Sequence, residues 1–284
     1  MKSHVLPQGS GYLVAWPAGK KCGGLILRRP PKRWSSSLGS VPTDPDISTV
    51  AALMGEPARA AVLVALLDGR ALAASTLAAE ATVAPSTISG HLSRLVDGGL
   101  IKVEASGRYR YFRLASPAVA EAVEALARLA PSEPIRSLRQ SMHRDAIRRA
   151  RSCYDHLAGR LGVALADSLV TSGAVVVDRD PNQGPDPVVG AGRSLRYCLT
   201  SEGRARLADL GVLLTPSRQR PIARYCLDWS EQRPHLGGQL GAAIFDCLVD
   251  KGWLERAERR VVRITPSGRA GLLQDFDIDV TALG

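Results

Sequence analysis

The sequence has few of the residues and none of the short motifs on which most enzyme classes depend. It holds five histidines and five cysteines in 284 residues. It has no glycine-rich phosphate loop, no nucleophile elbow and no HExxH motif. No apolar run approaches the roughly 20 residues that a membrane-spanning helix requires. We therefore expect a protein that is not an enzyme and has no membrane partner.

The cysteine count also argues against a disulfide framework. Five is an odd number, and the chain is too long to need covalent staples, so the pattern is typical of reduced thiols in a cytoplasm. The N-terminus lacks the continuous apolar core of a secretion signal. These features predict a cytoplasmic location. The five thiols are Cys22, Cys153, Cys198, Cys226 and Cys247.

What the chain does have is positive charge, with a formal net charge of +10 and a pI of about 9.8. A basic chain is attracted to nucleic acid. At 45% hydrophobic residues it can build roughly two domains with cores of their own. Residues 1–46 are rich in glycine, proline, serine and clustered cations. We expect a disordered basic N-terminal extension there, which either follows DNA phosphates or is dispensable.

Residues 75–114 carry the most informative pattern. Pro85 suits the first turn of a helix, apolar side chains follow at helical spacing, and Gly98-Gly99 ends the run. A short Ala-rich helix precedes Pro85, and two alternating segments, 100–104 and 109–114, follow with a turn between them. Helix, turn, helix and β-hairpin form a winged helix-turn-helix.

The polar residues of this motif suit double-stranded DNA. The 85–97 helix would enter the major groove, and the hairpin tip would contact the backbone or the minor groove. A winged helix used only for protein contacts is the alternative. The predicted DNA-binding residues are Ser86, Thr87, Ser89, His91, Arg94, Arg108, Tyr109 and Arg110.

Residues 50–129 resemble the ArsR/SmtB family of bacterial repressors. The resemblance is carried by GEPARAAVLVALLDG at 55–69, PSTISGHLSRLVDGGLI at 85–101 and EASGRYRYFRL at 104–114. It implies a homodimer that leaves its operator DNA when an inducer, often a metal ion, binds. Two departures are clear. The segment 77–81 lacks the cysteines of the family's arsenic, lead and cadmium sensors, and 117–129 lacks the Asp and His ligands of its zinc sensors.

These patterns divide the chain into segments. After the extension, residues 47–130 form the winged-helix DNA-binding and dimerisation domain, in which the helix at 117–129 is expected to pair with 47–53 across a twofold axis. Residues 131–152 form a linker and helix, and an Arg-rich helical region is expected over 135–161. Residues 153–284 form a C-terminal effector domain.

The effector domain contains an internal repeat. HLAGRLGVALADSLVTSGAV at 156–175 matches HLGGQLGAAIFDCLVDKGWL at 235–254 at half of its positions without a gap. The copies span about 153–211 and 226–273. Each is expected to be a degenerate winged helix, with an inserted wing loop at 178–192 in the first. The predicted fold class is therefore mainly α with small β-hairpins (α+β). The central helices are too apolar to read DNA and should be buried.

The repeat also brings together residues that bind soft or borderline metals. Cys153 with His156 and Cys226 with His235 form a candidate Cys2His2 site for zinc, cadmium or lead, with Asp155 and Asp228 as outer-shell partners. The alternative is that these residues only fill a core. A second alternative is an organic ligand held between the copies by aromatic side chains. The candidate aromatic residues are Trp229, Trp253, Tyr154, Tyr225 and Phe245.

The predicted function is that of a transcriptional regulator, with repression as the expected sign. It would bind operator DNA as a homodimer and be released by an unknown inducer, either a metal ion or a small organic molecule. The alternatives are a metal- or thiol-responsive regulator that senses through its C-terminal Cys and His residues, and a non-catalytic interaction scaffold. A scaffold would show no salt-dependent binding to a promoter fragment.

Overall fold

The computed structural model describes residues 44–131, 134–179, 195–214 and 220–284. The expected N-terminal extension therefore lies outside the described residues, apart from its last three positions, and so does most of the expected wing loop at 178–192. Within the described ranges, no single helix is long and apolar enough to span a bilayer, and one bent pair, 47–54 with 57–68, meets that test only by length and composition.

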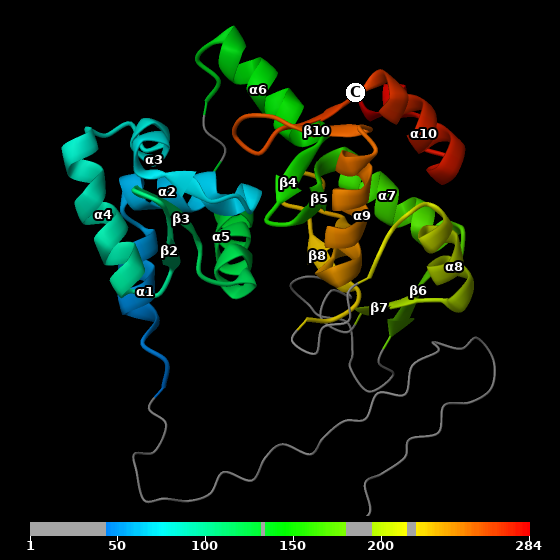
Figure 1. Ribbon diagram of the computed structural model, residues 1–284, viewed down its shortest axis with the longest axis horizontal. Helices are drawn as coiled ribbons and strands as arrows, with labels where there is room; N and C mark the ends of the chain where they lie inside the picture. Colours follow the sequence, from blue (N-terminus) through cyan, green and yellow to red (C-terminus); the bar gives the residue numbers. More distant parts are fainter. Residues whose placement is uncertain (1–43, 132–133, 180–194, 215–219) are drawn as a thin grey trace, which may run out of the picture. The chain divides into compact units, whose positions relative to one another are not determined.

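The first part of the described chain is a winged helix-turn-helix (Figure 1). Its elements are α1 (Ile47–Met54), α2 (Pro57–Ala65), η1 (Leu66–Asp68), β1 (Leu72–Ala73), α3 (Ala74–Glu80), α4 (Pro85–Asp97), β2 (Ile101–Ser106), β3 (Tyr109–Leu114) and α5 (Pro117–Leu129). The short β1 pairs with β3, which gives a three-stranded antiparallel sheet in the order β1-β3-β2. The predicted fold class is confirmed here, and α4 has the bounds predicted from the sequence.

Local capping explains where these helices begin. The carboxylate of Asp46 accepts hydrogen bonds from the backbone N–H groups of Ser48 and Thr49 at the start of α1. Glu56 caps α2 in the same way, and Pro57 occupies the first helical position, where no N–H is needed. Gly99 adopts a φ of +68° just after α4, so the chain can turn sharply into the wing.

One apolar cluster holds this domain together. Ile88, Leu92 and Leu95 form the inner face of α4 and are almost fully buried. They belong to the same cluster as Leu63 of α2 and Leu77 of α3. Because the apolar positions of α4 all lie on one face, its polar residues are left on the opposite face.

The segment after α5 differs from the expectation of one long helix over 135–161. Helix α6 (Leu138–Arg149) has no buried residue and ends at Arg149, because the chain then enters strand β4 (Arg151–Cys153). A tight turn connects β4 to β5 (His156–Ala158), and the two strands pair antiparallel. Tyr154 in that turn has a φ of +62°, which is unusual for a residue other than glycine.

The C-terminal half consists of two copies of one unit, in the same element order. The first copy contains β4, β5, α7 (Gly159–Thr171), β6 (Val175–Arg179), β7 (Leu195–Leu199) and α8 (Ser201–Asp209). The second contains β8 (Arg224–Leu227), β9 (Pro234–Gly237), α9 (Gly238–Asp250), β10 (Leu254–Arg256), β11 (Val262–Ile264) and α10 (Pro266–Phe276), and the short η2 (Val280–Leu283) follows.

Each copy has the expected central helix, hairpin and final helix, but the expectation of a helix-turn-helix at its start is wrong. A β-hairpin stands where the first helix was expected. The reason is that Cys153 and His156 pair directly across a two-residue turn, which leaves no room for a helical turn. The six extra residues of the second copy only lengthen the hairpin loop, since Cys226 still pairs with His235.

The two copies share one core. Helix α7 packs against β9 of the second copy, and α9 packs against β5 of the first, so each central helix covers the hairpin of the other copy. A Cβ added at Gly162 of α7 would lie 3.6 Å from the Cβ of His235, and one added at Gly241 of α9 would lie 3.1 Å from the Cβ of His156. The copies thus pack on each other, and their apolar central helices are largely buried as predicted.

Candidate DNA interface and Cys/His cluster

Helix α4 presents a polar face to the outside. Ser86, Thr87, Ser89 and Arg94 are all exposed, and a Cβ added at Gly90 would meet no atom within 4 Å. Hydroxyl and guanidinium groups on an exposed helix can reach base edges in the major groove. Four of the five predicted helix contacts therefore lie on an accessible surface.

His91 differs from the other predicted helix contacts. Its side chain is largely buried, and Nδ1 lies 3.2 Å from the Glu56 carboxylate, which also caps α2. This contact directs the Nδ1 edge of the imidazole toward α2. The structure thus gives His91 a packing role that its place on the helix did not reveal.

The wing tip brings the remaining predicted DNA contacts together. Arg108, Tyr109 and Arg110 are exposed at the turn between β2 and β3. The guanidinium of Arg108 lies 5.1 Å from the centre of the Tyr109 ring and donates a hydrogen bond to its hydroxyl, 2.9 Å away. An arginine held against an aromatic ring loses less side-chain freedom on binding a phosphate.

The second candidate site lies where the hairpins of the two repeats meet. Cys153 and His156 are cross-strand neighbours in the β4–β5 hairpin, and Cys226 and His235 occupy the equivalent positions of β8–β9. One ligand atom from each of the four residues lies within 4.8 Å of all the others. Cys153, His156 and His235 are buried, and Cys226 is half-buried.

Two distances define the cluster. The Sγ atoms of Cys153 and Cys226 are 4.0 Å apart, and the Nε2 atoms of His156 and His235 are 3.2 Å apart. The two imidazoles face each other through the same ring nitrogen. Such an arrangement needs a proton or a metal cation between the two nitrogens, because two lone pairs at this distance repel each other.

Carboxylates hold the outer edges of both imidazoles. Nδ1 of His156 is hydrogen-bonded to Oδ1 of Asp155 at 3.2 Å, and Nδ1 of His235 lies 3.3 Å from Oδ2 of Asp228. The second contact is ionic rather than a well-aligned hydrogen bond. A carboxylate on Nδ1 orients the ring and leaves Nε2 as the inward-facing atom.

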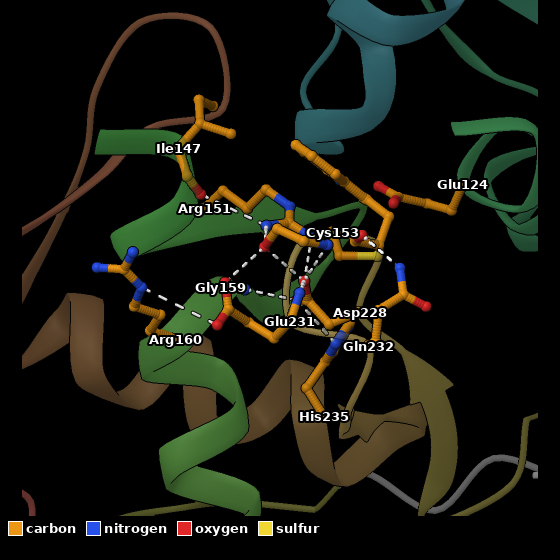
Figure 2. A network of polar contacts seen from close by, with 12 residues as sticks. Glu124, Ile147, Arg151, Cys153, Gly159, Arg160, Asp228, Glu231, Gln232 and His235 are labelled. Atoms are coloured by element: carbon orange, nitrogen blue, oxygen red, sulfur yellow. Dashed lines mark hydrogen bonds and ion pairs between the residues drawn. The ribbon is translucent and has the colours of Figure 1, made fainter. Parts of the chain in front are cut away.

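Asp228 is the centre of a buried polar network (Figure 2). It accepts hydrogen bonds from Nη2 of Arg151 at 2.8 Å and from the backbone N–H of Gly159 at 2.7 Å. Both donors come from the first repeat, whereas Asp228 belongs to the second. The fully buried Arg151 also stacks on the Trp229 ring, 4.5 Å from its centre. The network therefore joins the two repeats directly beside the Cys/His cluster.

Burial and close polar partners shift the pKa values of this region. The contact with Cys226, followed by burial, raises the pKa of the Cys153 thiol to about 12. Burial acts to lower the pKa of His235, but Asp228 and Cys153 outweigh it and raise that pKa to about 9. Burial acts to raise the pKa of Asp228, but His235 and Arg151 hold it far below its ordinary value. A thiol with so high a pKa reacts slowly with oxidants.

Three of the five aromatic residues considered for an organic ligand stack on neighbouring side chains. Phe245 stacks under Arg256, Trp229 under Arg151, and Tyr225 against Tyr197. A cleft of about 610 Å³ is lined by residues of the first repeat and by Pro234 of the second, and none of the five aromatic candidates is among them. The described part of the chain thus gives these aromatic residues packing roles.

Sequence reasoning missed the buried arginines. Arg151 and Arg260 are almost fully buried, and Arg260 pairs with the buried Glu124 of α5. Arginine normally indicates surface, so composition offers no signal for these positions. The signal available for Arg151 was its place two residues before the first cysteine of a repeat.

Comparisons with known proteins agree with the geometry of the first domain. A helix-turn-helix domain model matches residues 54–104. A Bacillus subtilis (strain 168) protein described as "Uncharacterized HTH-type transcriptional regulator YdfF" is 36% identical over 241 residues, which are 84% of this chain and all of that protein.

Solved structures match the winged-helix region. The cadmium metal-sensor CMTR from Mycobacterium tuberculosis is 29% identical and covers 32% of this chain and 99% of its own, with a TM-score of 0.26. The homodimeric winged helix-turn-helix DNA-binding domain of Mb0332 from Mycobacterium bovis, a possible ArsR-family regulator, is 26% identical and covers 29% of this chain and 75% of its own, with a TM-score of 0.27.

The alignment with YdfF is much longer than the helix-turn-helix match, so it includes most of the C-terminal repeats as well. The resemblance inferred from the sequence is confirmed as that of a winged helix-turn-helix regulator. With its recognition helix and wing in place, the chain belongs to the family of HTH-type transcriptional regulators that includes YdfF.

Proposed function

We propose that this transcriptional regulator binds operator DNA as a homodimer in the cytoplasm, acts as a repressor and is released by an inducer. One observation carries the proposal: α4 exposes its hydroxyl and guanidinium groups on the same domain that exposes the Arg108–Tyr109–Arg110 wing tip. Helix α4 would occupy the major groove, and the wing would contact the adjacent sugar-phosphate backbone.

Salt dependence tests this proposal. Each phosphate contact contributes about 0.9 to the slope of log affinity against log salt. Removing both wing arginines from both subunits, by Arg108→Ala with Arg110→Ala, should therefore reduce the slope by about 4. The matched control is Arg204→Ala with Arg269→Ala, which removes the same charge from exposed positions on α8 and α10. An unchanged slope in the wing variant would reject DNA binding by the wing. Binding of the parent that does not depend on salt would instead favour the interaction scaffold.

Exposed apolar side chains support a dimer through α1 and α5. Ile47 of α1 is 75% exposed, and Leu129 of α5 is 82% exposed. Val50, three residues after Ile47, and Leu126, three residues before Leu129, are also exposed. Pairing these helices across a twofold axis would cover those side chains and space two α4 helices for a palindromic operator. Leu126→Glu with Leu129→Glu should yield monomers in sedimentation equilibrium and weaken operator binding. Leu273→Glu, at an exposed position of α10, is the control.

A second candidate function concerns the inducer. The convergence of two cysteines and two histidines favours a metal-responsive regulator, with zinc, cadmium or lead as the signal, over a response to an organic ligand. The test is operator release in a gel-shift assay. Metal or chelator should change the affinity of the parent protein and leave that of Cys226→Ser unchanged.

A further inference from the structure

We propose that Cys153, His156, Cys226 and His235 bind a single zinc-class ion in a closed four-coordinate site that clamps the two repeats together. This inference deepens the metal response proposed above and rests on it only for its effect on DNA binding. Binding of the ion itself is argued from the hairpins alone.

The observed distances fit a tetrahedron around one ion. Zinc lies about 2.3 Å from a thiolate and about 2.0 Å from an imidazole nitrogen, so a regular tetrahedron has edges of about 3.8 Å between two sulfurs and about 3.3 Å between two nitrogens. The corresponding separations are 4.0 Å for the cysteines and 3.2 Å for the histidines. The sulfur–nitrogen pairs all lie within 4.8 Å. The corresponding edge of the tetrahedron is about 3.5 Å, so ion binding would draw the cysteines and histidines together by up to about 1.3 Å.

The donor set selects the class of ion. Two thiolates and two imidazoles suit a borderline or soft metal with tetrahedral preference, whereas magnesium and calcium prefer oxygen ligands. Four protein ligands leave no coordination position for a substrate, which is the arrangement of structural rather than catalytic zinc. The burial of three of the four ligands also excludes bulk water from the site.

The surroundings are built to orient these ligands. Asp155 and Asp228 face the outer nitrogens of the two histidines, and each carboxylate is itself held by an arginine, Arg220 at 2.6 Å and Arg151 at 2.8 Å. The arrangement occurs at both histidines, and in each case the arginine is distant in the sequence from the carboxylate that it holds. A cluster that only filled a core would not need a charged partner on each imidazole.

The glycines at the base of the cluster serve the same geometry. A Cβ at Gly162 or Gly241 would lie 2.5 Å or 2.1 Å from the carbonyl oxygen of Leu157 or Leu236, so each glycine lets its helix pack closely on the hairpin of its own repeat. Gly241 also lies close to His156 of the other repeat. Each repeat therefore supplies one cysteine and one histidine and also the helix that supports the histidine of the other repeat. An ion at the centre would cross-link residues 73 and 79 positions apart in the sequence.

Spectroscopy on the full-length protein tests the site without DNA. Loaded with Co²⁺, the parent should show the intense visible bands of tetrahedral cobalt and a thiolate charge-transfer band, with one ion per chain, and Zn²⁺ should displace the cobalt. Cys226→Ser and His235→Gln should lose or alter both features. The control is Cys247→Ser, which removes a buried cysteine whose Sγ donates to the Leu210 carbonyl instead.

The outer-shell substitution separates a metal site from a packed core. Asp155→Asn should weaken Co²⁺ binding by about 10- to 100-fold while the circular dichroism spectrum stays unchanged. Asp155 is the better choice, because Asp228 is fully buried against Arg151 and its variant could unfold. Absence of tetrahedral cobalt in the parent, or a Cys153–Cys226 disulfide in the protein as isolated, would overturn the proposal.

The two proposals fail in different ways. Tetrahedral cobalt without any operator binding would leave the site intact and reject the DNA-binding proposal. Salt-dependent operator binding with no metal uptake would do the reverse. Metal uptake with no change in operator affinity would retain the clamp and reject the metal as inducer.

Discussion

Helix α5 carries two carboxylates that pair with arginines of the C-terminal repeats in opposite environments. Glu124 pairs with Arg260, and both side chains are almost fully buried, at 5% and 8% exposure. Glu121 pairs with Arg224, and both are more than a third exposed, at 44% and 37%. Because the two glutamates stand on the same helix, Glu→Gln at each position is a matched pair of perturbations.

The expected losses differ several-fold. Removing one partner of a buried ion pair costs about 3–5 kcal/mol, because the other charge stays buried without compensation. An exposed pair contributes about 0–1 kcal/mol, since water and salt screen it. For a chain of this size, 1 kcal/mol shifts Tm by about 2–4 °C. Glu124→Gln should therefore lower Tm by about 10 °C, and Glu121→Gln by no more than about 4 °C.

Denaturant unfolding and calorimetry measure these losses. A third variant isolates the cause: Glu124→Leu combined with Arg260→Met removes both charges and keeps apolar volume, and it should recover most of the stability that Glu124→Gln loses. Arg260 also donates a hydrogen bond from Nε to the Ser152 carbonyl at 3.0 Å, so Arg260→Met leaves that carbonyl without this donor and recovery should be incomplete. Equal losses for the two Glu→Gln variants would refute the burial argument.

Three further predictions follow from the same structure. Burial acts to raise the pKa of Glu124, but Arg260 outweighs it and lowers that pKa. The ionised Glu124 therefore contributes fully to stability above its ordinary pKa of about 4.3, and this contribution is lost as pH falls through the lower pKa of the folded state. In acid unfolding curves, the difference in stability between the parent and Glu124→Gln should narrow below about pH 4. Gly241→Ala places a Cβ 2.1 Å from the Leu236 carbonyl oxygen and should lower Tm and weaken Co²⁺ binding. Gly252→Ala, at a position with φ of +67° and no atom within 4 Å of the added Cβ, should leave Co²⁺ binding unchanged. Gly90→Ala in α4 meets no neighbouring atom and should raise the free energy of unfolding by about 1 kcal/mol, measured by urea denaturation.

The winged helix was predictable because its signals are local. Pro85, the apolar spacing of α4 and Gly98-Gly99 each act within a few residues, and α4 begins and ends where they predict. The two strands of the wing lie where the alternating segments predicted them, and β2 continues to Ser106, so the turn at the tip has two residues. His91 was the exception, since its contact with Glu56 depends on how α2 and α4 pack and not on the helix pattern itself.

The start of each repeat was not predictable in the same way. Strands β4 and β5 have three residues each and are buried on both faces, so they show no alternation of polar and apolar residues. Tyr154 takes a backbone conformation that usually indicates glycine or asparagine, so the turn carried no turn residue. The gathering of two cysteines and two histidines in one place was nevertheless predictable from the repeat, because equivalent residues of two packed copies can meet near the axis that relates the copies.

The buried arginines connect the Cys/His cluster to α5, which would give a physical route between the proposed metal response and the proposed dimer interface. On the first repeat, the backbone of Ser152, next to Cys153, is hydrogen-bonded to Arg260, and the Arg260 guanidinium pairs with Glu124 of α5. On the second repeat, Arg224, two residues before Cys226, pairs with Glu121 of α5. An ion that changes the spacing of β4 and β8 therefore acts on the helix proposed to form the dimer. Such coupling is reciprocal, so operator DNA must change metal affinity by the same factor as metal changes DNA affinity. Glu124→Gln should reduce this shared factor. A factor unchanged from that of the parent would place the route elsewhere.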